Sequence, residues 1–209
     1  MKAPVDQWEV QPLFSNPLYI AQDQMTDSIR DAVASLEFYD DPMKNNGENS
    51  KSQLVLDEIP ELKRTVEKHM TYYVHEVLSV HRRFQLRHTC SWATRHKTGN
   101  KAHKHSHCHS LWSGVIYIKT SPNCGRIAFH NDGHRPTYIN PAVQPELYEH
   151  TVLNSTEWTI EPEDGMIILF PSTVEHSVDV SRSLTDRYSV AFNYWLHGEF
   201  GDFTNKITL

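Results

Sequence analysis

From Cys90 onward, short β-prone runs alternate with turn residues. Each run is rich in β-branched and aromatic residues and is bounded by Gly, Pro or Asn. Strands are expected over residues 91–96, 102–108, 113–119, 126–130, 157–161, 166–170, 176–180 and 188–196. None is followed by a helical pattern that could cross over to a parallel neighbour, which disfavours parallel βαβ winding. The pattern predicts a mostly β fold, an antiparallel double-sheet β-roll with flanking helices.

The first 85 residues differ, with two helical segments. Thr26 is placed to cap a helix that carries Ile29, Val33 and Leu36 on one stripe. A second helix is expected after Pro60, because apolar residues recur at the helical period from 62 to 78. Residues 40–52 are expected to form a polar loop. We expect one domain over 1–209, with 1–85 as a helical buttress on one sheet and 86–209 as the β-roll core. A helix that binds a partner protein is the alternative.

Length and composition narrow the class of protein. The 209 residues suffice for one domain with a substantial core. No run approaches the roughly 20 apolar residues of a membrane helix, and the start of the chain lacks a signal-peptide pattern. These features predict a cytoplasmic protein that does not act at a membrane. The net charge of −6 argues against a broad nucleic-acid-binding surface. Three cysteines without paired spacing indicate neither a disulfide framework nor a four-cysteine zinc site.

The chain has 14 histidines, and four of them, His103, His105, His107 and His109, occupy alternate positions. Alternate residues of a strand point to one face, so any neighbouring pair can present two imidazoles to one metal ion. The tract is therefore a candidate metal half-site. A solvated edge strand or an adventitious metal binder explains the tract equally well.

Two later segments extend this pattern. His176 follows a turn, an apolar strand and a second turn, which places it at a sheet end where it can face a distant His-x-His pair. Arg187 and Ser189 share a strand face and can bind one carboxylate together. An ion pair between Arg187 and a carboxylate of the protein is the alternative. Non-haem iron oxygenases use three-ligand sets that leave coordination positions open. The joint occurrence of His-x-His, His and Arg-x-Ser, in this order and on strands, is far more specific than any one part.

These residues lie in motifs of a known family. The motifs are His105-Ser-His107 with Ser113-Gly114-Val-Ile-Tyr117, Gly125-Arg-Ile-Ala-Phe129, Pro162-x-x-Gly165 through Phe170-Pro171 to His176, Arg187-Tyr-Ser189-Val-Ala-Phe192-Asn193 and, upstream, Leu13-Phe14 and Ser91-Trp92. In them the sequence resembles the iron(II)- and 2-oxoglutarate-dependent oxygenases, specifically a bacterial and phage branch with an H-x-H…SGVxY motif. The likeness is firmest over 91–196. The Ser113-Gly114 landmark favours His105 and His107 over their neighbours.

The resemblance implies a double-stranded β-helix, a cupin-like jelly roll, with Fe(II) held by His105, His107 and His176. Most members of the wider class have Asp or Glu at the position of His107. A third histidine makes the site more positive by about one charge than a two-histidine-one-carboxylate site. We predict that His107 coordinates the metal. The alternative is a carboxylate from elsewhere, with Asp132 the nearest candidate.

The resemblance also implies that Arg187, helped by Ser189, binds the distal carboxylate of the cosubstrate 2-oxoglutarate. Tyr117 adds a hydroxyl contact, unless it is an ordinary core tyrosine. With molecular oxygen, the implied reaction hydroxylates a substrate that the sequence does not identify. A long loop over 134–151 is expected, and the substrate entrance is expected to be bordered by His130, Asn131, Asp132, His134 and Arg135.

Two other functions use the same histidines. A cupin-like metal-binding protein, such as an isomerase, a cosubstrate-independent dioxygenase or a sensor, does not need Arg187-x-Ser189 behind the metal. A catalytically inactive fold that serves as an interaction module needs no metal at all. The arginine therefore separates the oxygenase from both.

Overall fold

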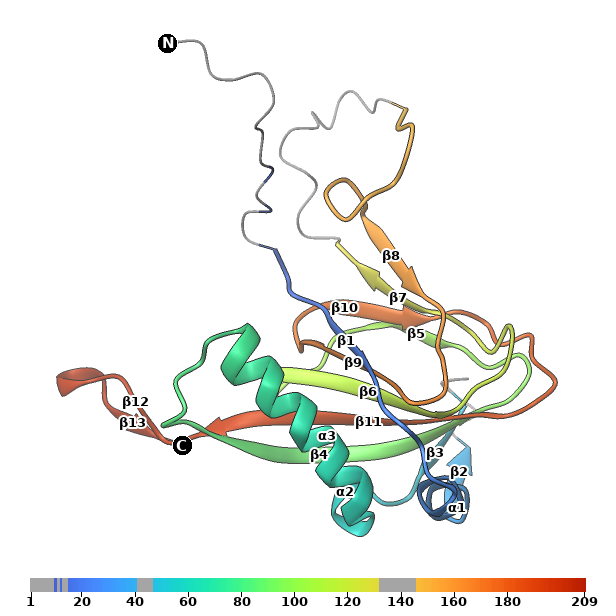
Figure 1. Ribbon diagram of the computed structural model, residues 1–209, viewed down its shortest axis with the longest axis horizontal. Helices are drawn as coiled ribbons and strands as arrows, with labels where there is room; N and C mark the ends of the chain where they lie inside the picture. The colour runs from blue at the N-terminus through green and yellow to red at the C-terminus, as the bar shows by residue number, and fades with distance from the viewer. Residues whose placement is uncertain (1–9, 11, 13–14, 41–46, 132–145) are drawn as a thin grey trace.

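The computed structural model describes residues 10, 12, 15–40, 47–131 and 146–209 (Figure 1). Its helices are α1 (Asp27–Ala34), α2 (Val55–Glu58), α3 (Pro60–Tyr72), a π-helical turn (Tyr73–Val77) and a 3-10 turn (Phe203–Asn205). Its strands are β1 (Tyr19–Gln22), β2 (Phe38–Asp40), β3 (Glu48–Ser50), β4 (Gln85–His96), β5 (Ala102–His105), β6 (Trp112–Lys119), β7 (Ile127–His130), β8 (Glu157–Ile160), β9 (Met166–Pro171), β10 (Glu175–Val178), β11 (Arg187–His197), β12 (Glu199–Phe200) and β13 (Ile207–Thr208).

The strands form two main sheets in which every pairing of named strands is antiparallel. The larger sheet has seven strands in the order β1-β9-β6-β11-β4-β3-β2, and the smaller has four in the order β5-β10-β7-β8. Strands β12 and β13 form a separate hairpin. In Figure 1 the smaller sheet lies over one face of the larger sheet, and α2 and α3 cover the other face. This arrangement confirms the predicted β-roll, and it is the double-stranded β-helix that the resemblance implied.

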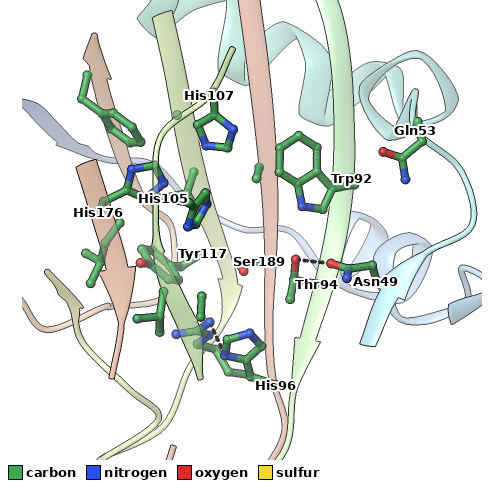
Figure 2. A pocket seen from close by; sticks show the side chains of 18 of the residues that line it. Asn49, Gln53, Trp92, Thr94, His96, His105, His107, Tyr117, His176 and Ser189 are labelled. Atoms are coloured by element: carbon green, nitrogen blue, oxygen red, sulfur yellow. Dashed lines mark hydrogen bonds between the residues drawn. The ribbon is translucent and has the colours of Figure 1, made fainter. Parts of the chain in front are cut away.

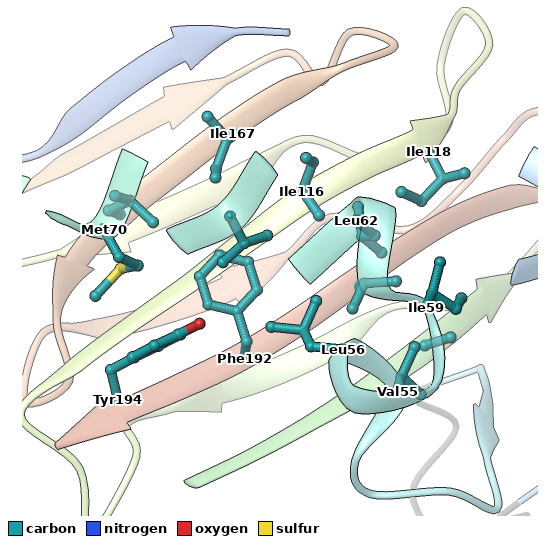
Figure 3. Packing of buried hydrophobic residues seen from close by; sticks show 14 of the residues in the cluster. Val55, Leu56, Ile59, Leu62, Met70, Ile116, Ile118, Ile167, Phe192 and Tyr194 are labelled. Atoms are coloured by element: carbon teal, nitrogen blue, oxygen red, sulfur yellow. The ribbon is translucent and has the colours of Figure 1, made fainter. Parts of the chain in front are cut away.

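Two apolar clusters follow from this layering. The larger cluster joins α1, α2 and α3 to the outer face of the seven-stranded sheet (Figure 3). The smaller cluster takes side chains from both sheets and therefore lies between them. Along β11, Val190, Phe192 and Tyr194 belong to the helix-covered cluster, whereas Arg187 and Ser189 line a cavity on the other face. The period of two along a strand thus separates core residues from site residues.

Most of the predicted elements are confirmed. Each strand expected from residue 91 onward is present, and most ends differ by no more than two residues. The larger changes are that β4 begins at Gln85 and β5 ends at His105. The Thr26 hydroxyl caps α1 by accepting a hydrogen bond from the Ile29 amide at 3.3 Å. The second helix begins at Pro60 as expected and ends in the π-helical turn. The helices pack on one sheet, as predicted.

The prediction of a polar loop over residues 40–52 is wrong for residues 48–50. Glu48–Ser50 forms β3, which pairs with both β2 and β4. A run of Glu, Asn and Ser has low intrinsic strand propensity, so tertiary contacts stabilise it. The buried Ser50 hydroxyl accepts a hydrogen bond from the Ala93 amide at 2.9 Å, and Glu48 pairs with Arg95. Three strands from the first 85 residues thus extend the larger sheet.

Several predictions lie outside the described residues, namely Leu13-Phe14, residues 134–145 of the expected long loop and Asp132. Of the expected entrance residues, only His130 and Asn131 are described. The His130 ring contacts the Ser177 hydroxyl at 2.8 Å and the Glu157 carboxylate at 3.3 Å. Within the described ranges, no helix has the length and apolar character needed to cross a membrane.

Candidate metal and cosubstrate site

Three histidines lie close together, two of them at and just after the end of β5 and the third on β10 (Figure 2). His105 ends β5 and lies directly opposite His176 of β10 in the register of the two strands. His107 follows β5, and its amide donates a hydrogen bond to the Ser172 carbonyl at 2.9 Å. The ring centroids are 4.4 to 5.2 Å apart. One nitrogen from each ring lies within 4.8 Å of the other two, and this is the only such group of potential ligands in the described part of the chain.

The hydrogen bonds of the His105 and His176 rings indicate which nitrogen of each ring is available to a metal ion. Nδ1 of His105 is 2.7 Å from the His103 carbonyl oxygen, and Nδ1 of His176 is 3.0 Å from the Val174 carbonyl oxygen. A carbonyl oxygen only accepts, so each Nδ1 carries the proton and each Nε2 keeps its lone pair. This is the arrangement by which backbone carbonyls orient metal-binding histidines.

Burial keeps the rings of His107 and His176 neutral. It lowers the pKa of His107 to about 4 and that of His176 to about 3, with the neighbouring His105 adding to both shifts. Neutral imidazoles are the form that binds a metal, and no proton has to leave them at neutral pH. The three ring nitrogens, all within 4.8 Å of one another, lie close enough together that they could hold one divalent first-row metal ion such as iron.

The structure separates these histidines from the rest of the tract. His103 and His109 are exposed and belong to no potential metal-binding group in the described residues. His109 has a positive φ of 58°, so the chain turns there and the strand period no longer applies. Asp132, the alternative third ligand, lies outside the described residues.

Arg187 lies at the start of β11 and is only 3 % exposed. Nη1 donates to the Gly125 carbonyl at 3.0 Å and to the Cys124 carbonyl at 3.4 Å, and Nη2 donates to Nδ1 of His96 at 2.7 Å. Nε has no hydrogen-bond partner. Among the described residues no carboxylate pairs with this guanidinium, so a protein ion pair does not account for its burial. Burial lowers its pKa, yet an arginine remains charged near neutral pH. A buried cation without an anionic partner lowers the stability of the fold, so the space beside Arg187 is suited to binding an anion.

One cavity of about 390 Å³ connects the three histidines to Arg187. Ser189 and Tyr117, which are register partners on β11 and β6, line it between these groups. Burial raises the pKa of Tyr117 to about 12, so its hydroxyl stays protonated and can donate. The cavity thus offers three imidazoles and, beside them, a cation and two hydroxyls. These are complementary to a metal ion chelated by a molecule with a second, anionic end.

Some lining residues were not predicted from the sequence. Trp92, Thr94 and His96 alternate along β4 on the cavity side, and the Trp92 ring lies 5.8 Å from the His107 ring. The period-two rule applied to the predicted strand over 91–96 could have found them. Asn49 and Gln53 complete the wall away from the histidines (Figure 2). Asn49 lies on β3, one of the strands that the sequence did not reveal.

The comparison with protein families agrees with this geometry. A family model described as "Putative 2OG-Fe(II) oxygenase" matches residues 90–193, a span that includes all six predicted site residues. The chain belongs to the 2OG-Fe(II) oxygenase family. Members of this family use iron and 2-oxoglutarate. No curated protein sequence matches the chain significantly.

Solved structures share the oxygenase fold. HygX from Streptomyces hygroscopicus, with nickel, 2-oxoglutarate and hygromycin B bound, superposes with a TM-score of 0.59 at 14% identity, covering 86% of this chain and 82% of that chain. A prolyl-4-hydroxylase from Pseudomonas putida gives 0.52 at 13% identity, covering 87% and 94%. A Trichoplax adhaerens prolyl hydroxylase, in complex with a hypoxia-inducible-factor peptide, gives 0.56 at 12% identity, covering 88% and 85%. At these identities the likeness shows a common fold.

Proposed function

We propose that this chain is an iron(II)- and 2-oxoglutarate-dependent oxygenase, a hydroxylase of an unidentified substrate. In this proposal His105, His107 and His176 hold the iron, and Arg187 binds the distal carboxylate of 2-oxoglutarate. The observation that carries it is a buried arginine, without a carboxylate partner in the described chain, in the same cavity as the three histidines. HygX, which has the same fold, was solved with both nickel and 2-oxoglutarate bound, and this supports the assignment. A cytoplasmic location remains a prediction of the sequence.

When bound, iron and 2-oxoglutarate supply the oxidative decarboxylation that drives oxidation of a substrate C–H bond. The residues of the chain bind and orient these groups. The three histidines would hold the ion and leave other coordination positions for ligands from outside the protein. Arg187 neutralises the far end of the cosubstrate, while Ser189 and Tyr117 donate from the cavity wall. Arg187, Ser189 and Tyr117 are all buried, which keeps water from competing for their hydrogen bonds to the cosubstrate.

Arg187 favours the oxygenase over a cupin-like metal protein. A protein that needs only the metal gains nothing from a buried guanidinium with an unused donor, and a buried cation without an anion destabilises the fold. A carboxylate ligand removes that cost in the oxygenase. The same reasoning disfavours an inactive interaction module, because its core could replace Arg187 by an apolar residue.

Anaerobic titration with Fe(II) tests the metal assignment. The wild-type protein should bind about one Fe(II) per chain, as expected for a single three-ligand site. His176→Ala should abolish binding, because Nε2 of His176 is one of the three donors. His103→Ala is the matched control, since it removes an exposed imidazole from the same tract and should leave binding intact. Stoichiometric iron in His176→Ala would contradict the proposal.

A further inference from the structure

His96 makes the closest side-chain contact to Arg187. It ends β4, is 2 % exposed, and lies opposite Arg187 in the β4–β11 register. Its Nδ1 accepts the 2.7 Å hydrogen bond from Nη2 of Arg187, drawn as a dashed line in Figure 2. Gly47 packs against the same ring so closely that a Cβ at this position would collide with Cδ2 of His96. The ring is therefore held between a backbone segment and the guanidinium.

The bonds to Arg187 leave a defined pair of donors. A guanidinium has five N–H groups in a rigid plane. The protein accepts from three of them, two on Nη1 through the carbonyls of Gly125 and Cys124 and one on Nη2 through His96. Five minus three leaves two, the Nε–H and the second Nη2–H. These two lie on one edge of the plane, and that edge matches the two oxygens of a carboxylate.

We propose that His96 is a positioning residue for the cosubstrate. By holding Nη2, it fixes the rotation of the guanidinium so that the edge formed by Nε and Nη2 receives the distal carboxylate of 2-oxoglutarate. This inference rests on the proposed function. A guanidinium only donates, so Nδ1 of His96 must carry a lone pair, and the neutral ring must carry its proton on Nε2. Neither a core packing role nor a metal-binding role requires this tautomer.

Two conservative variants separate positioning from packing. In His96→Asn the side-chain oxygen lies near the place of Nδ1 and can still accept from Arg187. In His96→Gln the size and polarity are kept, but the amide group extends to the place of Nε2. Anaerobic calorimetry on the Fe(II)-loaded proteins measures binding of 2-oxoglutarate and of 2-oxobutanoate, which has the chelating end but lacks the distal carboxylate.

We expect His96→Gln to weaken 2-oxoglutarate binding by about 10-fold or more, the effect of misplacing one hydrogen bond to a charged group. We expect His96→Asn to stay within about threefold of wild type, and 2-oxobutanoate and Fe(II) binding to change by less than about threefold in both variants. In ¹⁵N NMR spectra of histidine-labelled wild-type protein, His96 should carry its proton on Nε2.

Each contrary result has a separate meaning. Unchanged 2-oxoglutarate affinity in His96→Gln, or a proton on Nδ1 of His96, would overturn the positioning role. An equal loss of 2-oxobutanoate binding would show that His96 only supports the fold, and would overturn it too. Failure of the wild type to bind 2-oxoglutarate at all would instead refute the proposed function, and this inference with it.

Discussion

Replacing Arg187 by alanine removes the one lysine or arginine side chain that lines the cavity among the described residues. In the structure two of its N–H groups remain for a ligand after the bonds to the protein are counted. A charge-assisted fork of two such bonds is worth about 2–4 kcal/mol, because its loss leaves the carboxylate of the cosubstrate in a poorly solvated pocket. Arg187→Ala should therefore weaken 2-oxoglutarate binding by roughly 30- to 1000-fold.

Two milder variants should weaken 2-oxoglutarate binding less than Arg187→Ala does. Arg187→Lys should recover part of the affinity, since an ammonium keeps the charge but loses the planar fork. Ser189→Ala should cost about 1 kcal/mol, the value of one neutral donor. The assay is anaerobic calorimetric titration of the Fe(II)-loaded protein with 2-oxoglutarate, with succinate as a competitor.

Fe(II) binding is the internal control for these titrations, because Arg187 is not a ligand and the metal should bind normally in every variant. A thermal unfolding curve for Arg187→Ala checks that the loss of the bonds to the Cys124 and Gly125 carbonyls leaves the protein folded. Wild-type affinity for 2-oxoglutarate in a folded, iron-loaded Arg187→Ala protein would refute the reasoning. Arg187 would then be a structural residue.

Three further predictions test the third ligand, the packing and the pH dependence. Metal titration should show that His107→Ala loses Fe(II), whereas His107→Asp and Asp132→Ala keep it. If Asp132→Ala lost the metal and His107→Ala kept it, Asp132 would be the third ligand. Gly114→Ala should lower the free energy of unfolding in urea by about 1–3 kcal/mol, since its Cβ would lie 2.5 Å from a ring carbon of Phe192; an unchanged value would contradict the packing described. The Lys68 ammonium, more than any other group, lowers the pKa of Asp23 from 3.8 to about 2. This folded-state pKa lies below the unfolded one, so the stabilisation is complete above about pH 4 and is lost as the pH falls toward about 2. Asp23→Asn should therefore cost about 1 kcal/mol at pH 7 after solvent screening, and less at pH 3, by urea unfolding at both pH values.

The strands that carry the site could be predicted because local pattern and tertiary structure agree there. The apolar run before His176 is β9, buried on both faces, and the alternation from Arg187 to Asn193 is β11. A period of two fixes which side chains share a face, so the sequence placed Arg187 and Ser189 together. The helix after Pro60 was equally readable, because its apolar stripe packs on the sheet.

Other features depend on contacts that no local pattern encodes. Strand β3 is polar and exists through its pairing with β2 and β4 and the burial of Ser50. With β3 unrecognised, Asn49 could not be assigned to the cavity wall. The spacing of the alternate histidines allowed several metal pairs, and the choice of His105 and His107 came from the resemblance. In the structure only His105 and His107 of the tract lie near His176 in a potential metal-binding group among the described residues, and the chain turns at His109.

The central claim is that one cavity holds iron on His105, His107 and His176 and 2-oxoglutarate on Arg187. The most direct test is a crystal structure of the protein grown anaerobically with Fe(II) and 2-oxoglutarate, with anomalous diffraction recorded at the iron absorption edge. The account predicts one anomalous peak bonded to the three histidines and density for the cosubstrate with its distal carboxylate on Nε and Nη2 of Arg187. An iron bound by a carboxylate side chain in place of His107, or a distal carboxylate turned away from Arg187, would contradict it.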